Sequence, residues 1–157
     1  MVPMTELLLY EATRAQHVTE VIKPFLKKGG VVLCDRFSDA TVAYQGYGRR
    51  MDLKWIERLN HLSSQGIRPD VTFLLDCPTD MGLERALRRN RALKREKEER
   101  FEREKIQFHR RMRRGYLAIA KKEPRRVKVI DTREGEDKVF EKIRKIVDNL
   151  LVGSSEL

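Results

Sequence analysis

Long apolar runs and cysteine pairs are both missing from this sequence. No apolar stretch approaches the roughly 20 residues of a membrane-spanning helix, and the N-terminus lacks a basic region followed by a cleavage site. The two cysteines, Cys34 and Cys77, each lie within or just after an apolar run. A disulfide framework is therefore not indicated, and we expect two buried, inert thiols in a chain that works in the reducing cytoplasm.

Motifs for zinc binding and for common nucleophilic chemistry are also missing. The three histidines, His17, His61 and His109, are scattered without the spacing of a zinc site. Neither Gly-x-Ser-x-Gly nor Cys-x-x-Cys occurs. The sequence thus gives no indication of a metalloprotease, a serine hydrolase or a dithiol oxidoreductase.

What the chain does have is an uneven basic charge. Its 157 residues, 40% apolar and 37% charged, are enough for one globular domain with a core. The net charge is +10, and residues 84–126 carry 18 Lys and Arg against 7 acidic residues. The basicity therefore belongs to one segment, which needs its own explanation.

Hydrophobic periodicity predicts alternating helices and short strands. Three- and four-residue spacing indicates helices over 6–26, 38–45, 53–65, from 79 to about 120 with a break near Asn90, and 136–151. Short apolar runs at 31–34, 71–76 and 126–131 predict strands. Strands that are hydrophobic throughout and separated by helices are typical of a parallel sheet covered on both faces, an α/β fold.

The dipeptide Asp35-Arg36 follows the first predicted strand. Ligands of open α/β sheets bind beyond the carboxyl ends of the strands. There an Asp can hold a metal-bound water, and an Arg offers a planar fork for phosphate. An ordinary structural ion pair fits the dipeptide equally well, so both interpretations stay open.

Two sets of polar and aromatic side chains share helical spacing. Thr41, Tyr44 and Gln45 lie three and four residues apart, which suits contact with a small polar ring system. Tyr10 and Arg14 lie four apart, as a stacking ring and a hydrogen-bonding cation would. Taken singly, each set is also explained by the solvated edge of an amphipathic helix.

Together these pieces resemble the bacterial thymidylate kinases, which phosphorylate dTMP with ATP. The resemblance covers nearly all of residues 4–132, with the pieces in family order and at family spacing. The matching text is "TELLLYEATRAQHVTEVIKP", "VVLCDRFSDATVAYQGYGR", "GIRPDVTFLLDCP", "MGLERALRRN", "ERFE", "RRGYLAIAKKEP" and "VKVIDT".

The resemblance implies that five side chains bind the base and sugar of dTMP. Tyr10 corresponds to the ring that stacks on thymine, and Arg14 to the arginine that reaches a thymine carbonyl. Thr41 and Gln45 correspond to side chains at the thymine edge. Tyr44 corresponds to the tyrosine that packs on the sugar and favours deoxyribose.

The resemblance also implies the catalytic groups. Arg36 would grip the dTMP phosphate, and Asp35 would lie near the phosphates and Mg²⁺, holding the ion through water. The basic segment resembles the family's mobile lid, here 84–105, from which Arg85 and Arg89 would neutralise charge as ATP donates its γ-phosphoryl group. The implied partners are dTMP, ATP with Mg²⁺, and a second copy of the chain in a homodimer.

One family element is not in these 157 residues. A phosphate-binding loop of the form G-x-x-x-x-G-K-[ST] does not occur, so no residue for cradling ATP is identified. In the family this loop lies upstream of the first matching segment, with the first two strands. We therefore expect 1–157 to be a single, partial P-loop kinase domain that has no dTMP kinase activity alone, as from a truncated coding sequence.

Two other functions remain possible from the sequence. A basic arm over 84–126 could hold nucleic acid, although its interspersed Glu residues and few aromatics argue against this. A non-catalytic remnant that keeps the nucleotide pocket is the other alternative. The nucleic-acid reading predicts DNA binding that dTMP does not affect.

Overall fold

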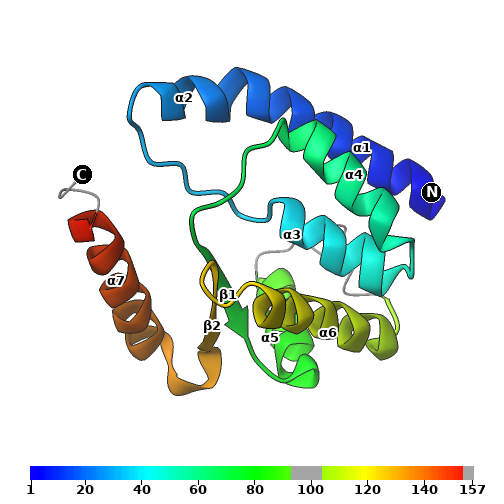
Figure 1. The fold of residues 1–157 in the computed structure, drawn as a ribbon. Helices are drawn as coiled ribbons and strands as arrows, with labels where there is room; N and C mark the ends of the chain where they lie inside the picture. Colours follow the sequence, from blue (N-terminus) through cyan, green and yellow to red (C-terminus); the bar gives the residue numbers. More distant parts are fainter. Residues whose placement is uncertain (93–103, 154–157) are drawn as a thin grey trace. The chain divides into compact units, whose positions relative to one another are not determined.

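The structure is a computed structural model that describes residues 1–92 and 104–153. The chain forms two compact units, shown in the ribbon of Figure 1. Unit 1 comprises Met1–Asp70 and Gln107–Ile119, and unit 2 comprises Val71–Ile106 and Ala120–Leu157.

Unit 1 begins with one long helical rod. Helix α1 (Pro3–His17), the π-helix η1 (Val18–Ile22) and helix α2 (Lys23–Lys27) follow one another without a break. Proline in the first turn suits a helix start, because its missing N–H is not needed there. This rod confirms the helix predicted over 6–26.

A second helical layer packs on that rod. Helix α3 (Ser38–Thr41) continues into the π-helix η2 (Val42–Gly48), and helix α4 (Leu53–Ser64) lies along α1 (Figure 1). The predicted start of α4 is confirmed, since the Asp52 carboxylate accepts a hydrogen bond from the Lys54 amide at 2.7 Å. Most of helix α6 (Ile106–Lys122) also belongs to this unit.

The core of unit 1 is small and apolar. Leu7 and Val18 from the rod, Ala43 from η2 and Ile56 from α4 have no exposed surface. Phe108 of α6 is 3% exposed. These side chains join elements that are far apart in the sequence, and so they determine how the 31–48 region is held.

Unit 2 contains a two-stranded parallel sheet. Strand β1 (Thr72–Asp76) pairs with β2 (Val127–Asp131) from Thr72↔Val127 to Asp76↔Asp131. Helix α5 (Thr79–Ala92) follows β1, and the short η4 (Thr132–Glu134) and helix α7 (Glu136–Gly153) follow β2. The strands predicted at 71–76 and 126–131 and their parallel pairing are thus confirmed.

The strand predicted at 31–34 is wrong. Residues 31–34 form neither strand nor helix, and Val31 and Leu33 are 72% and 94% exposed. A strand exists only when its amides pair with a neighbour, and no described segment pairs with this one. In its described part the α/β sheet that we expected is therefore reduced to two strands in a mostly helical chain.

The two cysteines differ in exposure. Cys77 is half-buried, but Cys34 is exposed, contrary to prediction, because it lies in the unpaired 31–34 segment. Partial desolvation of its sulfur still raises the pKa of the Cys34 thiol, which disfavours the reactive thiolate.

None of the helices within 1–92 and 104–153 is long and apolar enough to cross a bilayer.

We predict that two leucines of unit 1 differ sharply in their effect on stability. Leu7→Ala should lower the free energy of unfolding by about 2–5 kcal/mol, because Leu7 is wholly buried. Leu33→Ala should change it by less than about 0.5 kcal/mol, because Leu33 is almost fully exposed. Urea denaturation of the two variants measures both. A loss at Leu33 as large as that at Leu7 would show that 31–34 is packed after all.

Candidate active site

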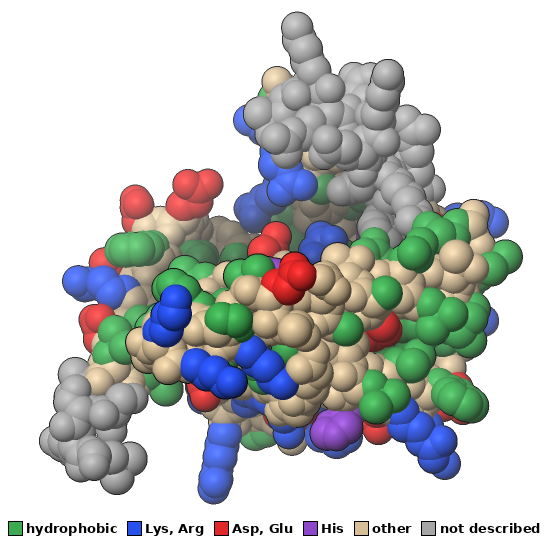
Figure 2. All heavy atoms as spheres, turned by 90° about the horizontal axis from the view of Figure 1, so that it is seen from above, with side chains coloured by type: hydrophobic (Ala, Val, Ile, Leu, Met, Phe, Trp, Pro, Cys, Tyr) green, Lys and Arg blue, Asp and Glu red, His purple; other side chains and the backbone are tan. Residues whose placement is uncertain are grey.

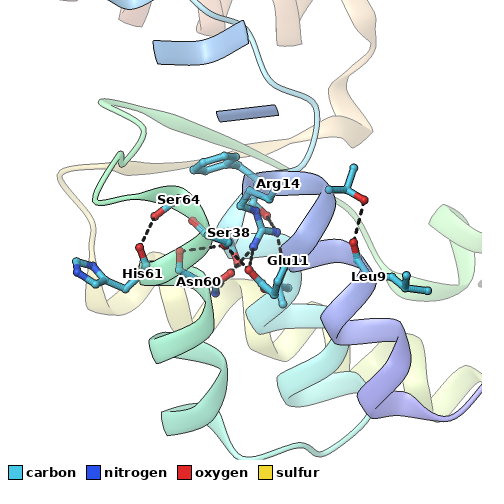
Figure 3. A network of polar contacts seen from close by, with 11 residues as sticks. Leu9, Glu11, Arg14, Ser38, Asn60, His61 and Ser64 are labelled. Atoms are coloured by element: carbon cyan, nitrogen blue, oxygen red, sulfur yellow. Dashed lines mark hydrogen bonds and ion pairs between the residues drawn. The ribbon is translucent and has the colours of Figure 1, made fainter. Parts of the chain in front are cut away.

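Arg14 is the centre of a polar network in unit 1 (Figure 3). Its Nη1 donates to the Glu11 carboxylate at 2.7 Å and to Asn60 Oδ1 at 2.6 Å. Its Nη2 donates to Thr41 Oγ1 at 2.5 Å and to the Phe37 carbonyl at 3.4 Å. The network therefore joins α1 to α3, α4 and the loop before α3.

The ion pair in this network is buried. The side chains of Glu11 and Arg14 are only 6% and 10% exposed. Glu11 Oε2 also accepts a hydrogen bond from the Ser63 hydroxyl, whereas Oε1 has no partner among the described residues. Buried charges are tolerated only when they are paired and hydrogen-bonded, so Glu11 balances the charge of Arg14 and holds its side chain in place.

These bonds limit how Arg14 can meet a ligand. Both hydrogens of each terminal nitrogen already have acceptors, and the weakest bond is the 3.4 Å contact to the Phe37 carbonyl. Thr41 Oγ1 accepts from Arg14, so its own proton points elsewhere. A ligand carbonyl would therefore meet the Arg14 Nε–H, an Nη2 proton released by Phe37, or the Thr41 proton.

The three residues predicted to share a face divide between two directions. Thr41 and Gln45 both point toward α1, where Gln45 Nε2 donates to Glu6 Oε1 at 2.8 Å. Gln45 as a whole is only 2% exposed. Tyr44 points instead toward α6. The change of direction comes from η2, because a π-helix has a wider turn than the α-helix assumed from spacing.

Tyr44 lies in an aromatic cluster. Its ring makes edge-to-face contacts with Phe108 and Tyr116, with centroid separations of 6.2 and 6.4 Å. The Arg36 guanidinium lies 5.1 Å from its centroid. The structure thus brings Arg36 and Tyr44 together, just as it brings together Arg14 and Thr41.

The backbone of Arg36 has an unusual conformation. Its φ is +66°, a left-handed value that few non-glycine residues adopt and that costs of order 1–3 kcal/mol. The strain turns the chain between the 31–34 segment and α3, and the side chain extends over Tyr44.

Asp35 is exposed beside Arg36. In the described part of the chain, no three His, Cys, Asp or Glu side chains are grouped to hold a metal ion. Mg²⁺ on nucleotide phosphates commonly needs only one or two carboxylates and keeps several waters. The accessible Asp35 carboxylate fits that role, and Mg²⁺ there would screen phosphate charge.

Tyr10 remains at the edge of the site. It lies one helical turn before Arg14 on α1 and is 41% exposed. An accessible ring at this position is free to meet a ligand. The structure places it on the same helix as the Arg14 network.

The two predicted lid arginines lie in unit 2, on α5. Arg85 makes long contacts to the backbone oxygen and hydroxyl of Thr132, at 3.4 and 3.5 Å, just beyond β2. The same hydroxyl donates to the Asp76 carbonyl at the end of β1. Arg85 therefore lies at the carboxyl edge of the sheet, and Arg89 is exposed one turn later. Residues 93–103 of the predicted 84–105 lid lie outside the described residues.

Several residues at this site were not identified from the sequence. The three-residue spacing of Glu11 and Arg14 was a usable signal for their ion pair. Asn60 is 46 positions from Arg14, and no local pattern could reveal that contact. Tyr116 is one of the few aromatic residues of the basic segment, and its contact with Tyr44 depends on how α6 packs.

We predict that the Glu11–Arg14 pair is important for stability. Glu11→Ala should lower the free energy of unfolding by about 3–5 kcal/mol, because it leaves the Arg14 charge buried without its partner. Glu20→Ala is the control: Glu20 is an exposed glutamate of the same rod, and its loss should cost less than about 0.5 kcal/mol. Equal losses in urea denaturation would contradict a special role for the buried pair.

Comparison with known proteins agrees with the resemblance noted in the sequence. The thymidylate kinase family matches residues 1–143. The thymidylate kinase of Geobacter sulfurreducens is 57% identical over 135 residues, which are 86% of this chain and 63% of that protein. That of Pelobacter propionicus is 51% identical over 154 residues, 98% of this chain and 70% of that protein.

A solved structure shows the same relation. The crystal structure of thymidylate kinase from Ehrlichia chaffeensis has a TM-score of 0.72 and 33% identity, covering 94% of this chain and 66% of that one. The chain spans 63% of the length of the Geobacter sulfurreducens enzyme, so it corresponds to only part of such an enzyme. This chain belongs to the thymidylate kinase family.

Proposed function

We propose that this chain carries the dTMP-binding half of a cytoplasmic thymidylate kinase, which transfers a phosphoryl group from ATP to dTMP and yields dTDP for dTTP synthesis. The observation that carries the proposal is the arrangement around residues 35–45. Arg14 contacts Thr41 on one side of this segment, and Arg36 contacts Tyr44 on the other. Base, sugar and phosphate groups would each meet a suitable side chain there.

The chemistry required of these residues is positioning and charge neutralisation. Phosphoryl transfer has little covalent work for the protein, because the attacking phosphate oxygen is already a nucleophile. Arg36 would hold the dTMP phosphate in line, with Asp35 near the Mg²⁺ site. Tyr10, Arg14, Thr41 and Gln45 would hold the base. Gln45 is buried and donates one Nε2 proton to Glu6, so its second amide proton and its carbonyl oxygen are the groups that could meet the base.

Arg85 and Arg89 would neutralise charge on the transferred group. In the described structure Arg85 makes only long, weak contacts, and Arg89 is exposed, so both guanidinium groups are accessible to phosphate. A P-loop for ATP does not occur in these 157 residues. ATP would therefore need residues beyond this sequence for its own phosphates.

We predict that the 157-residue chain binds dTMP and that Arg36→Ala weakens binding by about 10- to 100-fold. The loss follows from a hydrogen bond to a charged group, which contributes about 1.5–3 kcal/mol. Isothermal titration calorimetry measures the affinity. Arg58→Ala, at an exposed arginine of α4, is the matched control and should bind like the unaltered chain.

A turnover assay and a DNA-binding assay distinguish the proposed function from the alternatives. Supplied with ATP, Mg²⁺ and dTMP, the chain should form no detectable dTDP, whereas turnover would refute the partial-site account. Nucleic acid binding predicts strongly salt-dependent DNA affinity that dTMP does not change. That result, without any dTMP binding by the unaltered chain, would contradict the proposal.

A homodimer is part of the proposal. Hydrophobic side chains gather on the surface over the N-terminal part of α1 (Figure 2). Met1, Val2, Met4, Leu8 and Leu9 there are all between 49% and 69% exposed. An exposed apolar patch of this kind is typical of an interface.

We predict that sedimentation equilibrium gives twice the mass of one chain. Leu8→Glu should shift the measured mass toward that of the monomer, because it places a charge in the apolar patch. A monomeric unaltered chain would contradict the homodimer.

A further inference from the structure

The Tyr44 ring is held from three directions by side chains of unit 1. Phe108 and Tyr116, eight residues apart on α6, make edge-to-face contacts with interplanar angles of 67° and 84°. The Cζ atom of Arg36 lies 5.1 Å from the centroid of the Tyr44 ring. A ring with these neighbours cannot turn about its side-chain bonds without losing at least one contact.

The contact between η2 and α6 is close because a glycine on each side faces an aromatic ring on the other. A Cβ at Gly48 would lie 2.6 Å from the Phe108 ring, and one at Gly115 would lie 2.7 Å from the Tyr47 ring. Neither position therefore has room for a side chain. The two α6 aromatics are consequently held at a fixed distance from η2.

Hydrogen bonds add to this close packing. Arg111 of α6 donates to the Gly48 carbonyl from both Nε and Nη2, at 3.2 and 2.8 Å. That carbonyl ends the π-helix that carries Tyr44. The backbone on which the Tyr44 side chain stands is thus tied directly to α6.

The Tyr116 phenol is also kept protonated in the electrostatic environment of Arg36. Burial raises the pKa of the Tyr116 phenol, with Tyr44 and the carboxylates of Asp39 and Asp35 acting in the same direction and Arg36 opposing them. The phenol therefore stays uncharged at physiological pH. An uncharged phenol leaves the Arg36 charge for an anionic ligand.

We propose that Tyr116 and Phe108 are positioning residues that hold the Tyr44 ring where it excludes a ribose 2′-hydroxyl. The inference rests on the proposed function, in which Tyr44 packs on the sugar of dTMP. Selection for deoxyribose would then depend on α6, which itself has no assigned contact with the nucleotide. Loss of either α6 ring would give Tyr44 room to move away from the 2′ position.

The test is the ratio of affinities for dTMP and for the ribonucleotide with the same base, ribothymidine 5′-monophosphate. Tyr116→Leu removes the ring and should reduce the preference for dTMP by about tenfold, as expected when the fit around one small group is lost. Tyr116→Phe keeps the ring and should keep the preference. Trp55→Leu, which removes an exposed aromatic of α4, is the control and should leave the ratio unchanged.

The outcomes are distinguishable. If the unaltered chain does not bind dTMP, the proposed function fails and this inference fails with it. If dTMP binds but folded Tyr116→Leu keeps the full preference, only the inference is overturned. If Tyr116→Phe loses as much preference as Tyr116→Leu, the hydroxyl acts on the nucleotide directly and the positioning role is also overturned.

A ligand-free measurement covers the case in which Tyr116→Leu fails to fold. NMR of the unaltered chain should show Tyr44 ring protons shifted by the neighbouring rings, with ring rotation slower than for an exposed tyrosine. Phe108→Leu should reduce both effects. Freely averaged, unshifted Tyr44 ring signals in the unaltered chain would overturn the proposal.

Discussion

The buried ion pair of Glu11 and Arg14 is the constraint on which the candidate site depends. Taking both charges out of water is costly, and the cost is offset only because each group has further hydrogen-bonding partners. Those partners come from the loop before α3, from α3 and from α4. The hydrogen bonds of the buried Arg14 guanidinium therefore bring together α1, the loop before α3, α3 and α4.

The segment 35–48 is held from both sides, and each side has its own chemistry. On the α1 side the contacts are polar and buried: Arg14 bonds to Thr41, and Gln45 bonds to Glu6. On the α6 side they are aromatic, with Tyr44 against two rings. In the proposed dTMP site, such an arrangement would fix the binding side chains before the ligand arrives and so reduce the entropy lost on binding.

The elements with strong local signals could be predicted from the sequence. Asp52 caps α4 because its side chain can accept from the next turn, a signal contained in a few residues. Strands 72–76 and 127–131 also followed from composition, as did the rod that carries Tyr10 and Arg14. The contact of Arg14 with Thr41 agreed with their joint assignment to one site, although no local pattern contains it.

Other features depend on packing and could not be predicted. The π-helix turns Tyr44 away from Thr41 and Gln45, although α-helical spacing placed all three on one face. The 31–34 run has the composition of a strand but no described segment to pair with, so Leu33 and Cys34 are exposed. The contact of Tyr116 with Tyr44 joins residues 72 positions apart and requires the glycine-mediated approach of α6.

The central claim is that residues of unit 1 form a dTMP site without any contribution from an ATP loop. An amide-resolved NMR titration of the ¹⁵N-labelled chain with dTMP tests this directly. We expect saturable shifts at Tyr10, Arg14, Arg36, Thr41 and Tyr44, and small changes along α7. Absence of shifts in that group, or shifts confined to β2 and α7, would contradict it.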